Sequence, residues 1–269
     1  MGTRIQSTDI AGQKTSGGSS VDLEVAAAKG CLARAEVDPR SLGILINTGV
    51  YRDGHVFEPA IASVIQQRIG GNQEFDGTLS TLSFDLMNGG CGAVTGMMVA
   101  DGFILSGLTR YVLVVSGDAE PVPAESTGYG FSPAAAAALL TPGSDGEGFV
   151  AFESDSDTRY LESFRARIEW THDGDPRRHL HLESSAGYMD HCAGSALRSL
   201  EALLAREGLA LRDVDLLLPS QSPRGIVDEV RRRTGLGDAV VDVTGEYGDV
   251  HTAGAVSYTH LTLPTIYSV

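Results

Sequence analysis

The stretch from Ser83 to Gly107 constrains this chain more than any other, because it places a cysteine at the start of an apolar helix. It predicts a short strand over 82–86, a glycine-rich turn, and a helix over 93–105 that is apolar almost all round. Cys91 lies in the turn, where the helix begins. A helix that is apolar on every side must be buried, so the turn that carries the cysteine is held by the core.

The residues around Cys91 favour a reactive thiol. Backbone N–H groups at a helix start have no partner inside the helix and carry the positive end of its dipole, so they stabilise a thiolate. Gly89, Gly90 and Gly92 let the backbone bend tightly and let a substrate come close. This pattern is typical of a nucleophilic cysteine, and the alternative is a small buried thiol in a tight turn.

The same stretch carries a family resemblance. Residues 84–107, followed by Tyr-Val-Leu-Val-Val-Ser-Gly-Asp over 111–118, resemble the active-site segment of β-ketoacyl-ACP synthase III and its relatives in the thiolase superfamily. The runs 42–53 and 58–66 are similar to the same family. In that family a cysteine at this elbow takes an acyl group from a CoA or ACP thioester. The resemblance therefore implies that Cys91 is the acyl-accepting nucleophile and that its own N–H helps to hold the oxyanion.

Apolar periodicity predicts an α/β fold, in which helices alternate with buried strands and cover a parallel sheet. With the resemblance, this gives a thiolase-like fold of two pseudo-duplicated halves, whose sheets are covered by helices. We expect an N-terminal half over 1–150 that carries the nucleophile and an incomplete C-terminal half over 151–256. The predicted helices are 21–35, 59–69, 93–105, 193–207 and 224–234, the predicted strands are 42–47, 82–86, 111–116, 214–218 and 240–243, and 9–20 is a predicted loop.

The sequence at both ends of the chain indicates that it is a fragment of a longer protein of this kind. The resembled proteins begin with a strand and a long segment before the position of Gly2, and they continue after Val256 with a helix and a strand pair. Residues 257–269 instead have Thr or Ser at nearly every other position and resemble translated sequencing-adapter read-through. We expect a non-native tail there, and a divergent natural C-terminus is the alternative.

Two departures from the family alter the expected chemistry. The resembled synthases use a His in a Pro-His-Gln-Ala-Asn segment and an Asn in a Gly-Asn-Thr-Ser-Ala segment. Here Ser220 stands at the position of the His, and Asp249 stands at the position of the Asn. A neutral serine hydroxyl cannot replace an imidazole, and an ionised Asp repels a developing enolate. The resemblance then implies acyl transfer to an oxygen or nitrogen nucleophile rather than decarboxylative condensation.

His251 is the candidate general base. If residues 249–251 are extended, the side chains of Asp249 and His251 project to the same face, because strand side chains alternate. The two residues then form an acid–base element next to Cys91. The alternatives are a solvent-exposed loop histidine, and a Ser220 that is either inert or a catalytic hydroxyl.

Charge and cysteine content exclude several classes of function. A net charge of −15 leaves no basic stripe for nucleic acid. Three widely spaced cysteines suit a reducing compartment better than a disulfide scaffold, and no Cys/His cluster has the spacing of zinc ligands. No apolar run reaches membrane-spanning length, so we expect a cytoplasmic protein without a membrane or nucleic-acid partner.

The sequence thus predicts cysteine-dependent acyl transfer from an acyl-CoA or acyl-ACP thioester, without a metal or redox cofactor. The expected partners are the acyl carrier protein or CoA thioester and a second copy of the chain in a homodimer. One alternative is a decarboxylating ketoacyl synthase of the fatty-acid or polyketide type, in which another group replaces the missing His. A second alternative is an attenuated, non-catalytic subunit that pairs with an active homologue.

Overall fold

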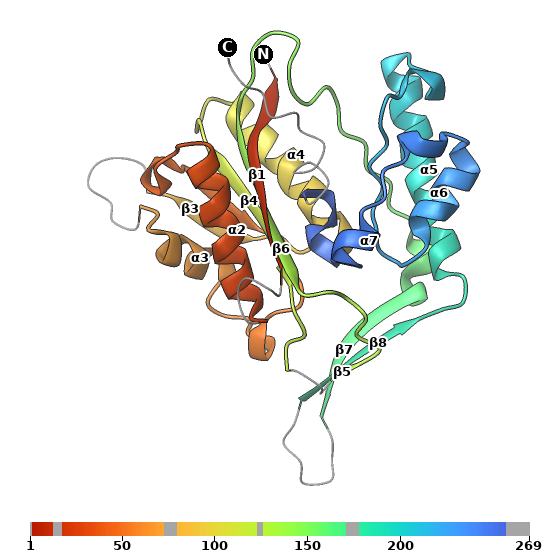
Figure 1. Ribbon diagram of the computed structural model, residues 1–269, viewed down its shortest axis with the longest axis horizontal. Coiled ribbons are helices and arrows are strands. Elements are labelled where there is room, and N and C mark those ends of the chain that lie inside the picture. Colours follow the sequence, from red (N-terminus) through yellow and green to blue (C-terminus); the bar gives the residue numbers. More distant parts are fainter. Residues whose placement is uncertain (1, 13–17, 73–79, 123–125, 171–177, 257–269) are drawn as a thin grey trace.

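A five-stranded sheet with helices on both faces forms the centre of the molecule (Figure 1). The computed structural model describes residues 2–12, 18–72, 80–122, 126–170 and 178–256. The strand order is β1-β6-β4-β2-β3. These strands are β1 (Thr3–Gly12), β2 (Ile44–Asn47), β3 (Leu82–Asp85), β4 (Val112–Asp118) and β6 (Ala134–Pro142).

The strands β2, β3 and β4 are parallel and end at one edge of the sheet. β2 pairs in parallel with both β3 and β4, and Asn47 aligns with Asp85 on one side and Val115 on the other. The carboxyl ends of these strands therefore lie together, where α/β folds gather their functional loops. β6 and β1 add to β4 as antiparallel strands.

Two layers of helix bury the sheet. Helices α2 (Ser20–Arg34) and α3 (Ile61–Ile69) pack on one face with Leu45, Leu113 and Val115. Helix α4 (Gly92–Leu105) packs on the other face with side chains such as Ile46 and Val114. Alternate residues of the strands thus face opposite cores, which is why the central runs are continuously apolar.

The sequence pattern did not predict β6. Its run of five alanines over 134–138 has a high helix propensity, yet it forms a strand that is buried on both faces. Ala135 and Ala137 face the α2 side, whereas Ala136 and Ala138 face the α4 side. Packing between two helical layers overrides local propensity here.

The remaining elements form a smaller sheet and a helical group. The sheet has the order β5-β8-β7, from β5 (Ser126–Thr127), β7 (Phe164–Trp170) and β8 (Arg178–Ser184). The helices are α5 (Tyr188–Glu207), α6 (Ile226–Thr234) and α7 (Thr244–Tyr247). In Figure 1 the helices α5, α6 and α7 lie to the right of α4, on the side away from α2, and the smaller sheet lies below.

Four predicted elements need correction. The predicted strands 214–218 and 240–243 form only an isolated bridge between Leu217 and Val240. Leu216 remains 54% exposed, so among the described residues no layer covers this segment as a core strand requires. The predicted loop over 9–20 is a strand as far as Gly12, because Asp9–Gly12 pair with β6, and α5 begins at Tyr188 rather than Ala193.

The other predicted elements are present, with ends shifted by a few residues. The prediction about the tail over 257–269 lies outside the described residues. Within the described residues, no helix has the length and apolarity needed to cross a membrane.

Candidate functional site

Cys91 lies at the predicted position, between a tight turn and the helix α4. The prediction that this helix is buried on every side is wrong, because Val94, Met98 and Leu105 are 40–56% exposed. The 3-10 turn η3 (Gly89–Cys91) leads directly into α4, and Cys91 is exposed at the junction. Gly89 has a φ of 50°, which favours glycine. A Cβ at Gly92 would lie 3.1 Å from the Cβ of Thr48, so a side chain there would crowd β2. The turn and the close helix–sheet approach both require the glycines that the sequence supplies.

The backbone N–H of Cys91 is already used. It donates a hydrogen bond to the carbonyl of Asn88 at 3.1 Å, and the N–H of Gly92 donates to the carbonyl of Gly89. The expectation that the Cys91 N–H holds an oxyanion is therefore wrong for this conformation.

The Cys91 thiol is not activated by its surroundings alone. Partial burial of the sulfur raises the pKa of Cys91 above its ordinary value. Its reactivity therefore depends on a base that removes the proton. Of the other cysteines, Cys31 is buried, and burial raises its pKa to about 12. Cys192 is half-buried in α5, and burial raises its pKa as well.

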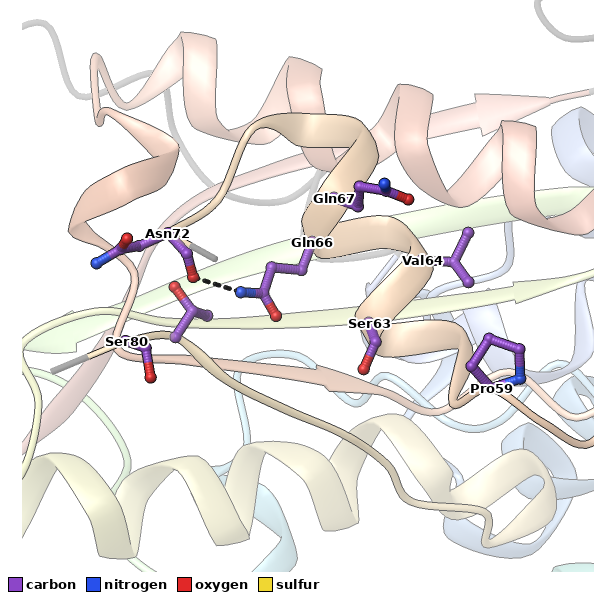
Figure 2. Close-up of a pocket in the computed structure, with 8 residues that line it drawn as sticks. Pro59, Ser63, Val64, Gln66, Gln67, Asn72 and Ser80 are labelled. Atoms are coloured by element: carbon purple, nitrogen blue, oxygen red, sulfur yellow. Dashed lines mark hydrogen bonds between the residues drawn. The ribbon is translucent and has the colours of Figure 1, made fainter. Parts of the chain in front are cut away.

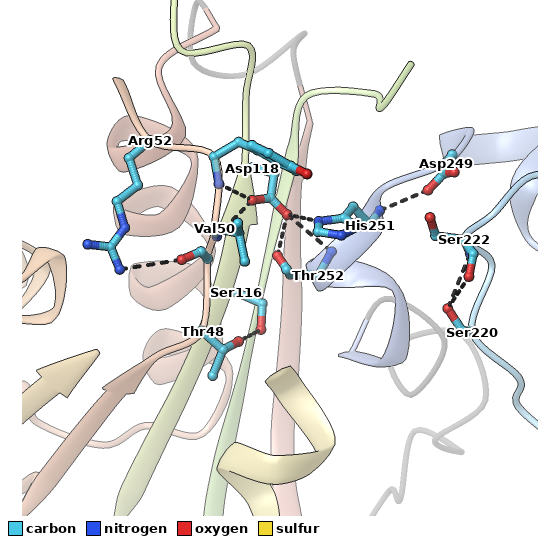
Figure 3. A network of polar contacts seen from close by, with 12 residues as sticks. Thr48, Val50, Arg52, Ser116, Asp118, Ser220, Ser222, Asp249, His251 and Thr252 are labelled. Carbon is cyan, nitrogen blue, oxygen red and sulfur yellow. Dashed lines mark hydrogen bonds and ion pairs between the residues drawn. The ribbon is translucent and has the colours of Figure 1, made fainter. Parts of the chain in front are cut away.

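His251 forms a buried pair with Asp118 (Figure 3). The Nδ1 of His251 lies 3.0 Å from Oδ2 of Asp118. The same oxygen accepts hydrogen bonds from the backbone N–H of Thr252 at 3.1 Å and from its hydroxyl at 2.5 Å. The other carboxylate oxygen, Oδ1, accepts from the N–H groups of Val50 and Tyr51 at 2.9 and 2.7 Å. Five donors thus fix one carboxylate at the carboxyl end of β4.

These contacts keep Asp118 ionised. Complete burial would by itself raise the pKa of Asp118, but the hydrogen bonds and the charge of His251 outweigh it and hold the pKa below its ordinary value. An ionised carboxylate at Nδ1 makes Nδ1 the proton-bearing nitrogen and leaves Nε2 with the basic lone pair. Within the described residues, Nε2 has no hydrogen-bond partner. The His251–Asp118 pair therefore has the arrangement of a general base with its orienting acid.

Aromatic rings hold the imidazole in place. The ring of Phe131 stacks on it at a centroid distance of 4.4 Å, and the ring of Tyr51 lies at 5.2 Å. Only 9% of His251 is exposed, so the alternative of a loop histidine in solvent is wrong.

The predicted pairing of Asp249 with the imidazole of His251 is also wrong. Residues 249–251 are not extended, because His251 has a φ of 44° and begins the 3-10 turn η7 (His251–Ala253). Asp249 instead accepts a hydrogen bond from the backbone N–H of His251 at 3.1 Å. Burial raises the pKa of Asp249, and hydrogen bonds with this N–H and with Ser222 oppose that rise. Asp249 thus shapes the turn, and a direct catalytic role for it stays a prediction.

Ser220 lies near Cys91 but uses its hydroxyl locally. A Cβ at Gly90 would lie 3.8 Å from Oγ of Ser220, which places this residue beside η3. The hydroxyl donates to the carbonyl of Ser222 at 2.8 Å and accepts from the N–H of the same residue at 3.2 Å. These bonds favour the interpretation of Ser220 as a residue without a catalytic hydroxyl.

The structure brings the predicted residues together and adds a residue that sequence reasoning missed. Turns η3 and η7 pack against each other, so Cys91 and His251 come from adjoining segments. Asp118 was not predicted as a site residue. Its position at the carboxyl end of a buried parallel strand was a signal for it, because functional groups gather at that edge of such a sheet.

A second buried acid lies beneath this site. Glu24 of α2 is 1% exposed, and its side chain fills the space left by Gly49 and Gly117, where any Cβ would overlap it. Its Oε2 has no partner among the described residues. Burial, followed by the charge of Asp118, raises the pKa of Glu24 well above its ordinary value. Glu24 is therefore expected to carry a proton when folded.

The protonated state of Glu24 predicts how the substitution Glu24→Gln changes the free energy of unfolding with pH. In the unfolded chain the pKa of this carboxyl is about 4.3, and in the folded protein it is higher. Between these two pKa values unfolding releases a proton, so the stability of the wild type falls as the pH rises. Gln has the same shape and does not titrate. The free energy of unfolding of the variant, relative to that of the wild type, should therefore be higher at pH 7 than at pH 4 by roughly 1–3 kcal/mol. Urea unfolding at both pH values measures this. A free-energy difference that does not change with pH would contradict it.

Two pockets differ in chemistry. The pocket in Figure 2, of about 420 Å³, is lined by residues of α3 and its surroundings, including Ser63, Gln66 and Thr81, and those of its lining residues that the structure describes are all uncharged. A second pocket, of about 280 Å³, shares Val50 and Tyr51 with the surroundings of Asp118 and also reaches Met87, just before Cys91. Among the described residues, no three His, Cys, Asp or Glu side chains are grouped to hold a metal ion.

Comparisons with known proteins agree with this geometry. A sequence profile of the family 3-oxoacyl-[acyl-carrier-protein] synthase III matches residues 84–158, which include Cys91 and Asp118. The chain is 24% identical over 242 residues to β-ketoacyl-ACP synthase III of Geobacillus kaustophilus, covering 86% of this chain and 70% of that protein. It is 26% identical over 255 residues to the enzyme of the same name from Dinoroseobacter shibae, covering 88% and 73%.

Solved structures show the same fold. The 3-oxoacyl-ACP synthase III of Pseudomonas aeruginosa matches with a TM-score of 0.78 at 18% identity, over 98% of this chain and 89% of that one. The enzyme of the same name from Aquifex aeolicus matches with a TM-score of 0.72 at 17% identity, over 97% and 91%. The chain thus has the α/β fold of these synthase III structures, as its sequence predicted, and its residues 84–158 match the synthase III family.

Proposed function

We propose that this β-ketoacyl-ACP synthase III-like protein is a cysteine-dependent acyltransferase that accepts an acyl group from an acyl-CoA or acyl-ACP thioester. The observation that carries the proposal is the exposed Cys91 next to a histidine oriented by a buried carboxylate. The names of its relatives support an enzyme of the ketoacyl synthase type. A homodimer and a cytoplasmic location stay predictions.

In the first step His251 acts as the general base. Nε2 takes the proton of the Cys91 thiol, whose raised pKa makes such a base necessary. Asp118 stays ionised and stabilises the imidazolium that forms. The thiolate attacks the thioester carbonyl, an S–C bond to Cys91 forms, and the S–C bond to the carrier breaks. The departing thiolate receives the proton from the imidazolium.

In the second step the acceptor attacks the acyl-enzyme. An acceptor hydroxyl or amine gives its proton to Nε2 of His251 as it attacks the carbonyl carbon, and the Cys91 thiol is restored by that proton. This step needs a general base. It does not need the His and Asn side chains with which the family stabilises the enolate formed in decarboxylative condensation. Ser220 has no imidazole to supply, and its hydroxyl is bonded within its own loop. The site therefore favours transfer over decarboxylative condensation.

Release of carbon dioxide distinguishes these two reactions. With malonyl-ACP and an acyl-CoA, this protein should release carbon dioxide about 10²–10⁴ times more slowly than a relative that has the family histidine, since that is the usual contribution of a general acid–base group. Release of free CoA from the acyl-CoA should continue in the same samples. Carbon dioxide release at the relative's rate would contradict the preference for transfer.

A further inference from the structure

The pocket beside the Asp118–His251 pair combines apolar walls with cationic side chains. Ile168 of β7 and Leu180 of β8 form part of its apolar wall, together with Tyr51, whose ring also contacts His251. Arg52 and Arg167 line the same pocket. Among the described residues that line it, none is acidic. In a chain of net charge −15, this lining is unusual and points to an anionic ligand.

The apolar part suits a hydrocarbon chain. Phe57 is 71% exposed and Met87 is 57% exposed, although both side chains line the pocket. A methylene chain placed between them would remove apolar surface from water, which favours binding. Met87 also lies on the loop that leads into η3, so one segment carries both part of the pocket wall and Cys91.

Arg52 keeps one donor unused at this wall. Its Nη2 pairs with Oδ2 of Asp85 at 2.9 Å, but its Nε is buried and has no partner among the described residues. Asp85 is shared, because it also accepts from the N–H groups of Ile61 and Ala62 at the start of α3. The carboxylate therefore satisfies Arg52 only in part, and the guanidinium retains donor capacity.

Arg167 offers a more accessible guanidinium. Its Nε donates to Glu169 and its Nη2 pairs with Glu183 at 2.7 Å, while 42% of its side chain is exposed. Ion pairs at such exposure contribute little and can exchange partners. A carboxylate that enters the pocket can therefore compete for this guanidinium, whose fork matches carboxylate geometry.

We propose that the acyl group received by this pocket carries a carboxylate at the end remote from the thioester. This inference rests on the proposed function and specifies its substrate class as the half-thioesters of dicarboxylic acids. The apolar walls hold the methylenes, and the arginines bind the terminal carboxylate. The phosphates of CoA are a second source of negative charge, so the test compares two acyl groups on the same carrier.

Glutaryl-CoA and pentanoyl-CoA supply that comparison, because both acyl chains have five carbons and only one ends in a carboxylate. We expect glutaryl-CoA to acylate Cys91 about tenfold faster at limiting concentration, as a charge-assisted hydrogen bond predicts. Arg167→Gln should remove most of that preference, by lowering the rate with glutaryl-CoA more than the rate with pentanoyl-CoA. Arg212→Gln is the matched control, because Arg212 is highly exposed and only weakly paired, 3.9 Å from Asp213.

The outcomes separate the two proposals. Equal rates with both thioesters, or an equal loss of both rates in Arg167→Gln, overturn the carboxylate assignment and leave the acyltransferase intact. No acylation by either thioester overturns the acyltransferase and the carboxylate assignment together. Thermal unfolding checks that each variant folds. If Arg167→Gln does not fold, Arg167→Lys keeps the charge without the fork and should retain only part of the preference.

Discussion

Replacement of His251 by Gln is expected to slow the acylation of Cys91 by about 10²–10⁴-fold, the usual contribution of a positioned general base. The thiol has a raised pKa and is therefore mostly protonated near neutral pH, so it depends on the imidazole. Gln cannot take the proton but can still donate a hydrogen bond to Asp118. The measurement is the single-turnover rate of acyl-enzyme formation from an acyl-CoA, followed by intact-protein mass spectrometry.

The pH dependence gives this prediction a second readout. In His251→Gln the residual rate should rise steeply with pH, because the thiol, whose pKa is raised, must then ionise without a base. A matched control is His181→Gln, because His181 lies on β8 and pairs with Glu169 rather than with a site residue. A variant at His251 that acylates as fast as the wild type at pH 7 would remove His251 from the mechanism.

Asp118 explains why His251 can be the base although Ser220 has replaced the family histidine. The carboxylate is fixed by two backbone N–H groups from the loop after β2, so its position does not depend on the histidine. The imidazole then joins a preformed anion at the carboxyl end of β4. In the proposed mechanism the Asp118–His251 pair supplies the general base from a different position in the chain.

Much of the first half could be predicted because its local signals agree with its packing. The glycine-rich turn at Cys91 predicts the elbow, and the apolar runs of β2 and β4 predict strands buried on both faces. The alanine run of β6 could not be assigned in this way, since alanine favours helices and only two adjoining helical layers make it a strand. For 214–218 the error was the reverse: the apolar pattern predicted a strand, but among the described residues no layer covers this segment and it forms only an isolated bridge.

The sequence indicated two residues of the candidate site, Cys91 and His251, but neither Asp118 nor its pairing with His251. Cys91 and His251 follow from the motif and its departures, and the structure places them on adjoining turns. The partner of His251 is 133 residues away in the chain and depends on a left-handed backbone at His251, which no spacing rule reveals. An assumption of extended backbone between Asp249 and His251 therefore selected the nearer carboxylate instead of the correct one.

The most direct test of the account is the site of acylation. Incubation with an acyl-CoA should add one acyl mass to the protein, and peptide mapping should locate it on Cys91. Cys91→Ala should abolish the adduct, and Cys192→Ala should retain it as the matched control, because Cys192 is the other cysteine that is not fully buried. The account predicts labelling of Cys91 alone. Acylation that persists in Cys91→Ala, or that maps to Cys192 or Cys31, would contradict it.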